Sequence, residues 1–444
     1  MLNMIWQELK RLFLRKSTLL FLLLIILINF LALSPKRTAN ELNNINERAE
    51  YSDTMELLEG RELYDYKKSI IHKYAGVINQ KWINMIHSDY QNELVKASMK
   101  TVDEEAMLER YGANWEQEFK NNPEAYEDIT KDKEVDGVQI QKGKQPFYVN
   151  DYAITARGSV LYDIINETEA LINKEWNNPE KETYKNSDGE TITYLKKIPN
   201  NIAESPERLR MFQDKMNRIT EFYYDDSSGW NTLMSDIAEA RFLLALMIIF
   251  LTSRCFNSDY SAQTIDIIKV TKLGKQKVVF AKLIAILLTC IFTTLAYTAI
   301  FAIVNYTMFG LGNWNVNATA LSGFLSPYTY KEAFLGGVAI LLCGSITIGF
   351  LSAGLSVFFK KSYVTFALGL LIYILPIAIP NDLVKLFPVN YMDFSGIYFY
   401  SEMMKFMNHY IFTPTIIYGI SMVILLLCCV IIVPRYRSYA MTKE

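Results

Sequence analysis

Six stretches of the chain are apolar enough to be membrane-spanning helices. A helix needs about 20 mostly apolar residues to cross the hydrocarbon core, because every backbone N–H and C=O must be satisfied within the segment. The first two stretches are short and must borrow flanking residues to complete the crossing. The pattern predicts an all-α polytopic membrane protein with six transmembrane helices, whose apolar cores run from Thr18 to Leu33, Ala238 to Leu251, Val278 to Tyr306, Ala333 to Phe359, Tyr363 to Ile379 and Phe412 to Val433.

The N-terminus joins an amphipathic segment to the first apolar stretch. Ile5, Leu9, Leu12 and Phe13 share one helical face, and charged residues fill the rest, as is typical of a helix lying at a membrane surface. Residues 1–17 are therefore predicted to form a cytoplasmic elbow helix that braces a partner, with a plain basic flank as the alternative. Residues 18–34 form the first transmembrane helix or the apolar part of a signal peptide, for which Leu33-Ser34-Pro35 is a poor cleavage site.

A large polar segment, residues 35–236, separates the first two apolar stretches. Within Tyr184 to Leu195, the sequence Asn186-Ser187-Asp188-Gly189 is typical of a tight turn, which predicts a β-hairpin. Ser205-Pro206 predicts the start of a helix, because Ser can cap a helix and Pro is tolerated at its first position. We expect a mainly helical domain with this one small hairpin. Its amphipathic helices are indicated by apolar residues at helical spacing, namely Leu57, Leu58, Tyr64, Ile70, Ile71 and Tyr74, and then Leu161, Ile164, Ile165, Leu171 and Ile172.

The charge distribution predicts how the chain is oriented. Between Pro35 and Asp236 lie 26 of the 45 basic and 38 of the 47 acidic residues, although the mean hydropathy of the whole chain is only +0.09. Basic residues in short loops favour the cytoplasmic side. We therefore expect a multi-pass protein of a bacterial cell membrane, with both termini cytoplasmic and residues 35–236 extracytoplasmic. The short outer loops then hold only Lys331, Lys385 and Lys405, whereas the inner segments hold Lys10, Arg11, Arg15, Lys16, Arg254, Lys269, Lys272, Lys275, Lys277, Lys282, Lys360, Lys361, Arg435, Arg437 and Lys443.

Few residues are available for disulfide, metal or proton chemistry. All five cysteines lie in apolar stretches or at their edges, so none can form a disulfide in residues 35–236. The chain has three histidines and no metal-ligand spacing. Ionisable residues are nearly absent from the spans, which argues against a transporter driven by a proton or sodium gradient.

The segment 254–282, between the second and third spans, has the most specific pattern in the chain. It is too long for a bare connection and carries apolar residues that indicate structure. A helical register would place Asp259, Gln263 and Asp266 on one side and so favours a docking surface, although an ordinary positive-inside loop is the alternative. In order, the segment holds Phe256, Asp259, Gln263, Thr264, Asp266, Ile267, Lys272, Gly274, Lys275 and Lys282.

In this segment the chain resembles the permeases of type-2 ABC transporters. That family carries a Phe, an acidic residue three positions later, a small-Thr or Gln-Thr pair, an apolar turn, a basic bend with Gly and a Lys that opens the next helix. Asp259 stands where Glu is commoner, and Gln263 stands where Gly is common before Thr. The resemblance is closest from Ala238 to Arg435 and does not cover residues 35–236. It implies that the segment is a coupling helix bound to a separate cytoplasmic ATP-binding cassette ATPase, beside a second permease copy or homologue.

Two features near the outer side have alternative explanations. Residues 380–414 include Pro388, Tyr391 and the aromatic run Phe394 to Tyr400, which indicate either short re-entrant helices, as in the family, or an interfacial aromatic belt. Glycines in the fourth stretch indicate either close helix packing or an apolar pathway for cargo. They are Gly336, Gly337, Gly344, Gly349 and Gly354.

The chain has no ATP site of its own. Leu273-Gly274-Lys275-Gln276 lacks the first Gly and the hydroxyl of a phosphate-binding loop, so ATP and magnesium are expected only in the partner ATPase. We expect the permease subunit of an exporter for a peptide, antibiotic or lipid-like substrate, embedded in a lipid bilayer and without a nucleic-acid partner. The alternatives are a membrane-anchored sensor or scaffold with an outer ligand-binding domain, and a membrane enzyme, for which no organised set of acids, nucleophiles or metal ligands is visible.

Overall fold

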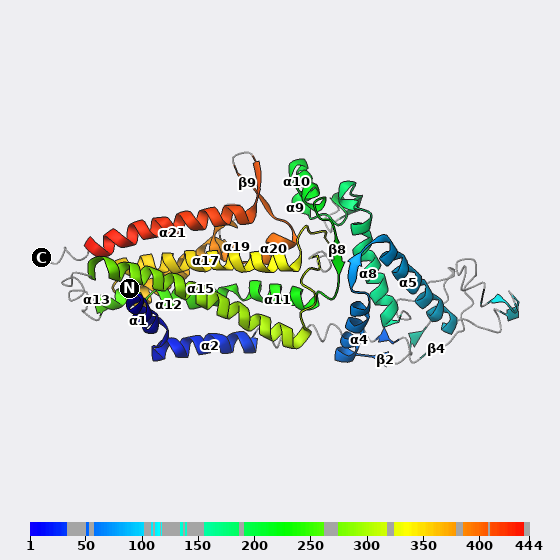
Figure 1. The fold of residues 1–444 in the computed structure, drawn as a ribbon, viewed down its shortest axis with the longest axis horizontal. Coiled ribbons are helices and arrows are strands. Elements are labelled where there is room, and N and C mark those ends of the chain that lie inside the picture. The colour runs from blue at the N-terminus through cyan, green and yellow to red at the C-terminus, as the bar shows by residue number, and fades with distance from the viewer. Residues whose placement is uncertain are drawn as a thin grey trace. The chain divides into compact units, whose positions relative to one another are not determined.

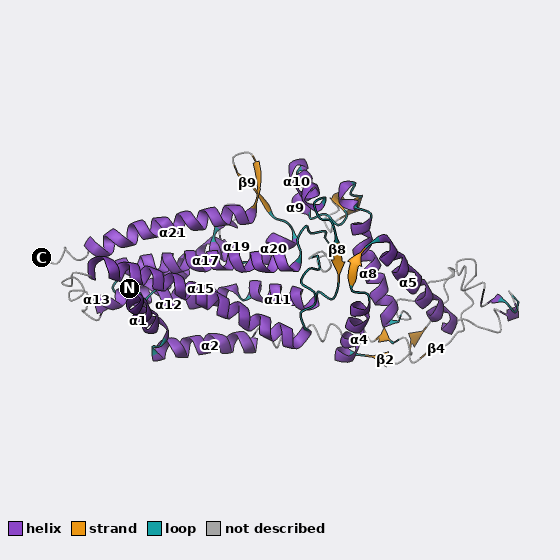
Figure 2. Cartoon of the chain, viewed as in Figure 1, coloured by secondary structure: helices purple, strands orange, loops and turns teal. Residues whose placement is uncertain are grey.

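The computed structural model shows a mainly helical protein (Figures 1 and 2). The chain folds into two compact units. The first unit comprises Met1–Lys36, Glu182–Asn217 and Ser227–Glu444, and the second comprises Arg37–Lys181 and Arg218–Asp226. The structure describes residues 1–32, 50–52, 57–101, 108–109, 112–115, 117, 134–135, 138–139, 155–185, 191–261, 274–317, 324–378, 385–406 and 409–438.

Each of the six predicted apolar stretches forms a helix in the first unit. Among the described residues, four helical segments are long and apolar enough to cross a membrane, namely Arg241–Asp259, Lys277–Phe309, Tyr330–Phe358 and Thr413–Tyr436. Thr18–Leu27 and Ser362–Ala378 are shorter apolar helices, so a six-span topology stays a prediction. The helices of this group are α2 (Lys16–Ala32), α12 (Arg241–Thr252), α13 (Asn257–Ser261), α15 (Gly274–Phe309), α17 (Tyr330–Phe358), α18 (Ser362–Ile374) with the 3-10 turn Leu375–Ala378, and α21 (Thr413–Ser438).

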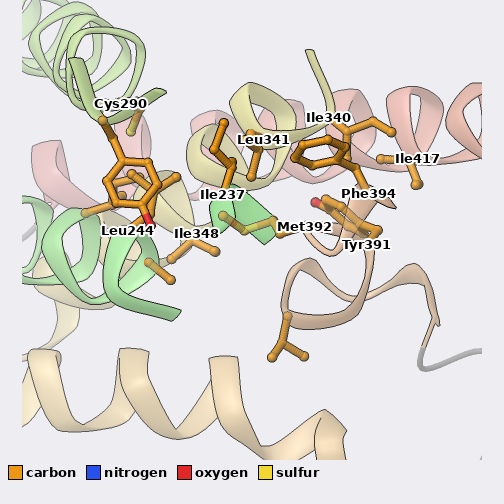
Figure 3. Packing of buried hydrophobic residues seen from close by; sticks show 14 of the residues in the cluster. Ile237, Leu244, Cys290, Ile340, Leu341, Ile348, Tyr391, Met392, Phe394 and Ile417 are labelled. Atoms are coloured by element: carbon orange, nitrogen blue, oxygen red, sulfur yellow. The ribbon is translucent and has the colours of Figure 1, made fainter. Parts of the chain in front are cut away.

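Helix α17 is the centre of the first unit. It packs against α12, α15, α18 and α21, and its start is fixed by a capping box in which Thr329 and Glu332 satisfy each other's backbone N–H groups. Figure 3 shows the apolar side chains that converge around it. They include Ile340, Leu341 and Ile348 of α17, with Ile237, Leu244, Cys290, Met392 and Ile417 from its neighbours.

The remaining elements of the first unit are short. The predicted hairpin is confirmed as the paired strands β6 (Lys181–Lys185) and β7 (Thr191–Leu195), and a second hairpin pairs β9 (Met403–Phe406) with β10 (His409–Phe412). Helix α10 begins at Pro206 as predicted, after Ser205 at the N-cap position, and ends at Met216. The other helices are α1 (Leu2–Phe13), α9 (Asn200–Ala203), α11 (Ser228–Glu239), α19 (Pro388–Tyr391) and α20 (Phe394–Phe399).

The second unit contains α4 (Gly60–Lys73), α5 (Gln80–Thr101) and α8 (Ala156–Ile172). Helix α8 packs against both others and buries Leu161, Ile164 and Leu171, as its apolar spacing predicts. Arg157 reaches the buried carboxylate of Glu93, 3.2 Å away. Leu57 and Leu58 form a strand rather than part of the predicted helix. The short strands are β1 (Glu50–Tyr51), β2 (Leu57–Leu58), β3 (Gly76–Ile78), β4 (Glu134–Val135), β5 (Val138–Gln139) and β8 (Phe222–Tyr224), paired β1 with β2, β3 with β8 and β4 with β5, and Glu175–Asn177 is a 3-10 turn.

The two units do not follow the bounds of the predicted outer domain, because residues 35–36, 182–217 and 227–236 belong to the first unit. Residues 182–217, which carry α9, α10 and most of the hairpin, group with the membrane helices. The reason is visible at Asn201, whose side-chain amide donates to the carbonyl of Tyr400 at 3.1 Å, and at Lys197, whose carbonyl accepts from the N–H of Leu325 at 2.7 Å. The extracytoplasmic position of residues 35–236 stays a prediction.

Candidate functional site

The turn that follows α12 contacts five other helices at one end of the bundle. We call residues 253–261, which include α13, the loop root, because they lead into residues 262–273. Figure 1 shows α13 and α1 at the same end of the bundle. Phe256 at its centre is fully buried, with its ring 5.2 Å from that of Tyr436 in α21. The backbone N–H of Phe256 donates to the hydroxyl of Ser356 in α17 at 3.3 Å.

Asp259 of the loop root accepts from three other elements. Its carboxylate lies 2.7 Å from Arg11 Nη1 in α1, 3.1 Å from Lys282 Nζ in α15 and 2.9 Å from the hydroxyl of Tyr436. The side chain has no exposed surface. A buried carboxylate needs this degree of pairing, because desolvation of an unpaired charge costs several kcal/mol.

Lys282 completes the cluster from the first part of α15. Its ammonium group donates to the Cys255 carbonyl at 2.8 Å and to Glu8 at 3.2 Å, besides its ion pair with Asp259. An ammonium group has three N–H donors, so all three have a partner. The side chain is fully buried, and Glu8 at its far side belongs to α1.

The four charged groups balance one another. Glu8 and Asp259 supply two negative charges, and Arg11 and Lys282 supply two positive charges. Burial acts to lower the pKa of the Arg11 guanidinium, but the charges of Asp259 and Glu8 outweigh it and raise that pKa above its ordinary value. The cluster has no net charge, and its contribution to stability depends on all four members being present.

Asn257 extends the contacts of the loop root to α18. Its side-chain amide donates to the Ser253 carbonyl at 2.8 Å and to the Thr365 hydroxyl at 3.3 Å. Together with Phe256 and Asp259, it joins the loop root to α1, α15, α17, α18 and α21. The contacts of this turn therefore reach five helices of the bundle.

The structure describes some of the predicted site residues and not others. Phe256, Asp259 and Lys282 are brought together in one cluster. Gly274 begins α15 and Lys275 follows it. The remaining predicted residues lie outside the described part of the chain, and they are Gln263, Thr264, Asp266, Ile267 and Lys272.

The docking surface that a helical register of Asp259, Gln263 and Asp266 favours stays a prediction. Of these three residues the structure describes Asp259, whose carboxylate is buried between Arg11 and Lys282 and is not exposed to a partner. Arg11, Glu8 and Tyr436 were missed as members of the cluster. Of these three residues, Glu8 and Arg11 could have been suggested by the sequence, because their opposite charges lie one helical turn apart on α1. The sequence offered no indication for Tyr436.

Helices α19 and α20 lie in the segment that is predicted to face the outer side, and they pack against the bundle. In α19 and α20, Tyr391, Phe394 and Tyr398 are buried, and both helices pack on α17 (Figure 3). A side chain at Gly337 would overlap the ring of Phe394, and a Cβ at Gly344 would lie 2.5 Å from Met392.

The glycines of α17 are therefore explained mainly by packing. Gly336 faces Tyr398, and Gly349 faces Cys290. Gly354 is looser, since the nearest side-chain atom to a Cβ there would be 4.0 Å away, in Ile432. At four of the five positions a neighbouring side chain fills the space that an apolar cargo pathway would need.

Comparison with known proteins identifies a family for this chain. A family model described as ABC-2 family transporter protein matches residues 2–433. The match includes α1, the loop root, α15 and nearly all of α21. No curated protein matches the chain.

Proposed function

From the membership of this chain in the ABC-2 transporter family, as a membrane subunit without an ATPase of its own, we propose that it is the permease of an ATP-driven exporter. A separate cytoplasmic ATP-binding cassette subunit supplies ATP hydrolysis with magnesium. A second permease copy or homologue completes the translocation unit. The cargo is a peptide, an antibiotic or a lipid-like compound.

The loop root is the observation that carries this proposal. Coupling to a motor protein requires a stiff connection between the surface that the motor binds and the helices that move. Phe256, Asn257 and Asp259 contact five other elements within a span of four residues. An ordinary cytoplasmic loop needs no such attachment.

In the proposed mechanism, residues 262–273 bind the ATPase and the loop root transmits its motion. Closure of the nucleotide-bound ATPase dimer pushes the segment that holds Asp266 and Lys272. The ion pair between Asp259 and Lys282 then tilts α15 together with α12, and the Arg11 contact carries α1 with them. Because the cluster is buried and fully paired, it favours rigid-body tilting over local bending.

The proposed topology has six spans with both termini in the cytoplasm. Residues 35–236 form the extracytoplasmic domain that shields or gates the exit. A cysteine introduced at Lys360 should react with a membrane-impermeant maleimide only after the membrane is opened, and one introduced at Ser187 should react in intact cells. The reverse pattern would place the ATPase-binding segment on the outer face and remove the basis of the proposal.

Co-purification with the ATPase subunit tests the docking role. Asp266→Lys and Lys272→Glu, made singly and together, should weaken retention of the ATPase on the tagged permease and abolish stimulation of its ATP hydrolysis. Lys360→Glu is the matched control, because it reverses an exposed charge in the turn after α17 and leaves residues 262–273 unchanged. Full retention and full stimulation in the double variant would refute the docking role.

Transport itself is tested in proteoliposomes that hold the permease with its ATPase. ATP should drive movement of a fluorescent amphipathic peptide or a fluorescent phospholipid, in the direction away from the ATPase. A sensor or scaffold would bind such a probe to the extracytoplasmic domain without probe-stimulated ATP hydrolysis. That result would favour the alternative function.

A further inference from the structure

A cavity of about 510 Å³ lies between α11, α19, α20 and the first residue of α21. Figure 1 shows α11 and α20 away from the end of the bundle that carries α13 and α1. Sites for small organic ligands typically measure about 300–1,000 Å³, whereas one water fills only ~30 Å³. The cavity therefore has the size of a ligand site, and an ion or a single water would leave most of it empty.

The walls of this cavity combine polar and apolar groups. Tyr391, Ile397 and Phe399 provide apolar surface, and hydroxyl groups come from Ser235 of α11 and Ser395 of α20. A hydrocarbon chain would desolvate the polar groups without offering them hydrogen bonds, which is unfavourable. The occupant must therefore present hydrogen-bonding groups as well as an apolar surface.

Helix α11 contributes two polar side chains to the cavity. Asn231 and Ser235 lie one helical turn apart and both line the cavity, beside the contact of α11 with α20. Neither side chain forms a hydrogen bond within the described part of the chain. An amide and a hydroxyl can each donate and accept, which matches a ligand that carries neighbouring hydroxyl groups.

The charges at the cavity are balanced. Lys385 Nζ lies 3.4 Å from Glu402 Oε1, and Arg241 Nη1, which is outside the lining, lies 3.1 Å from Asp393 Oδ2. With two charges of each sign, the cavity favours a ligand without net charge. The carboxylates can still accept from ligand hydroxyls, because a carboxylate has about four lone-pair sites.

The wall at Glu402 is fixed by backbone hydrogen bonds. The N–H of Glu402 donates to the carbonyl of Ile397 at 3.0 Å, and its carbonyl accepts from the N–H of Thr413 at 3.1 Å. Thr413 also lines the cavity, and its buried hydroxyl has no hydrogen-bond partner among the described residues. Because buried hydroxyls normally have a partner, this one indicates that a ligand or a water supplies it.

Tyr400 adds an accessible aromatic side chain to the lining. It is 43% exposed, and its ring contacts that of Phe324 edge-on at 5.7 Å. A pyranose has a face of apolar C–H groups and a rim of hydroxyls, so its face can pack on an aromatic ring while its rim forms hydrogen bonds. Aromatic surface, hydroxyl-binding side chains and balanced charge together match a sugar.

We propose that this cavity binds a neutral saccharide, with hydroxyls at Asn231, Ser235 and Glu402 and an apolar face on Tyr400. The saccharide is free or is the headgroup of a glycolipid, since both present the same hydroxyls. The binding does not rest on the proposed function. Only its position on the extracytoplasmic side does.

A glycan screen tests this proposal. The purified full-length protein, in a detergent whose headgroup is not a sugar, is applied to an array of neutral hexose and N-acetylhexosamine disaccharides. Wild type should bind at least one of them, and isothermal titration calorimetry then measures its dissociation constant. The same disaccharide on a lipid in nanodiscs distinguishes the two sources. Equal affinity identifies a free saccharide and tighter binding identifies a glycolipid, and either result supports the saccharide site.

Matched variants locate the binding in this cavity. Tyr400→Ala and Glu402→Gln should each raise the dissociation constant about tenfold, the effect of losing one ring contact or one charge-assisted hydrogen bond. Phe406→Ala and Glu207→Gln change an exposed ring and an exposed carboxylate outside the lining, and they should leave it unchanged. Ser235→Phe fills the cavity and should abolish binding, whereas Ser235→Ala should weaken it only slightly. This last pair keeps the test decisive if the other variants fold poorly.

Three results would overturn the proposal. One is that no neutral disaccharide binds, and another is that the control variants lose as much affinity as their counterparts in the cavity. The third is complete displacement of the disaccharide by trialanine at equal concentration, which would make the cavity a peptide site. Loss of ATPase co-purification would leave all these results unchanged, so the saccharide site and the exporter function fail separately.

Discussion

The ion pair between Asp259 and Lys282 offers the sharpest test of the loop root. Lys282→Met keeps the length of the side chain and removes its charge. The carboxylates of Glu8 and Asp259 then share the single cation Arg11. Asp259→Asn is the reciprocal change, and it leaves Lys282 and Arg11 with Glu8 alone.

The expected loss of unfolding free energy depends on which partners remain for each buried charge. Removing one member of a buried ion pair costs roughly 3–5 kcal/mol of unfolding free energy. We expect about 3 kcal/mol for each single variant, because Arg11 and Tyr436 still contact Asp259, and Glu8 still contacts Lys282. The double variant leaves a balanced pair of Glu8 and Arg11, so it should lose only about 4 kcal/mol, which is a coupling of ~2 kcal/mol.

Equilibrium unfolding of the purified subunit in mixed detergent micelles, followed by tryptophan fluorescence, measures these differences. Lys360→Met is the control for charge removal at an exposed site, with an expected change within about 0.5 kcal/mol. The reasoning fails if the sum of the two single-variant losses equals the loss of the double variant within ~0.5 kcal/mol. Such additivity is what distant, independent sites show.

Three further predictions concern other contacts. Tyr436→Phe should cost about 1.5–3 kcal/mol of unfolding free energy, because it removes a 2.9 Å hydrogen bond to the buried carboxylate of Asp259, and an unchanged midpoint in the same assay would contradict this. Gly337→Leu should destabilise the fold by at least about 1–3 kcal/mol, because Phe394 occupies the space that the new side chain needs. Gly419→Leu is the control and should be tolerated, because no atom lies within 4 Å of a Cβ at that position. Equal losses in the two variants would argue against the packing of α20 on α17. Burial lowers the pKa of Lys215 from 10.5 to about 8, so between these pH values the folded state binds fewer protons than the unfolded state. The unfolding free energy of wild type, measured relative to Lys215→Met, should therefore rise by roughly 2 kcal/mol from about pH 7.5 to 9.5. A difference that does not change with pH would refute the burial of this ammonium group.

The apolar pattern by itself determined the class of protein and most of its helices. All six apolar stretches are helical because a long apolar segment has few other ways to satisfy its backbone. The hairpin at residues 181–195 and the helix that starts at Pro206 followed from local turn and capping chemistry. The pattern from Phe256 to Lys282 indicated the family that the match over residues 2–433 shows.

Only the tertiary structure shows which residues contact the side chains of the pattern from Phe256 to Lys282. Helical spacing places Asp259 on a predicted docking surface, and spacing cannot show that Arg11, 248 positions away, neutralises it. The same holds for Tyr436 and for the α17 glycines, whose neighbours come from α15, α19, α20 and α21. Local patterns determine which segments become helices, whereas the pairing of buried charges and the filling of space depend on which helices meet, and that is a property of the whole packed chain.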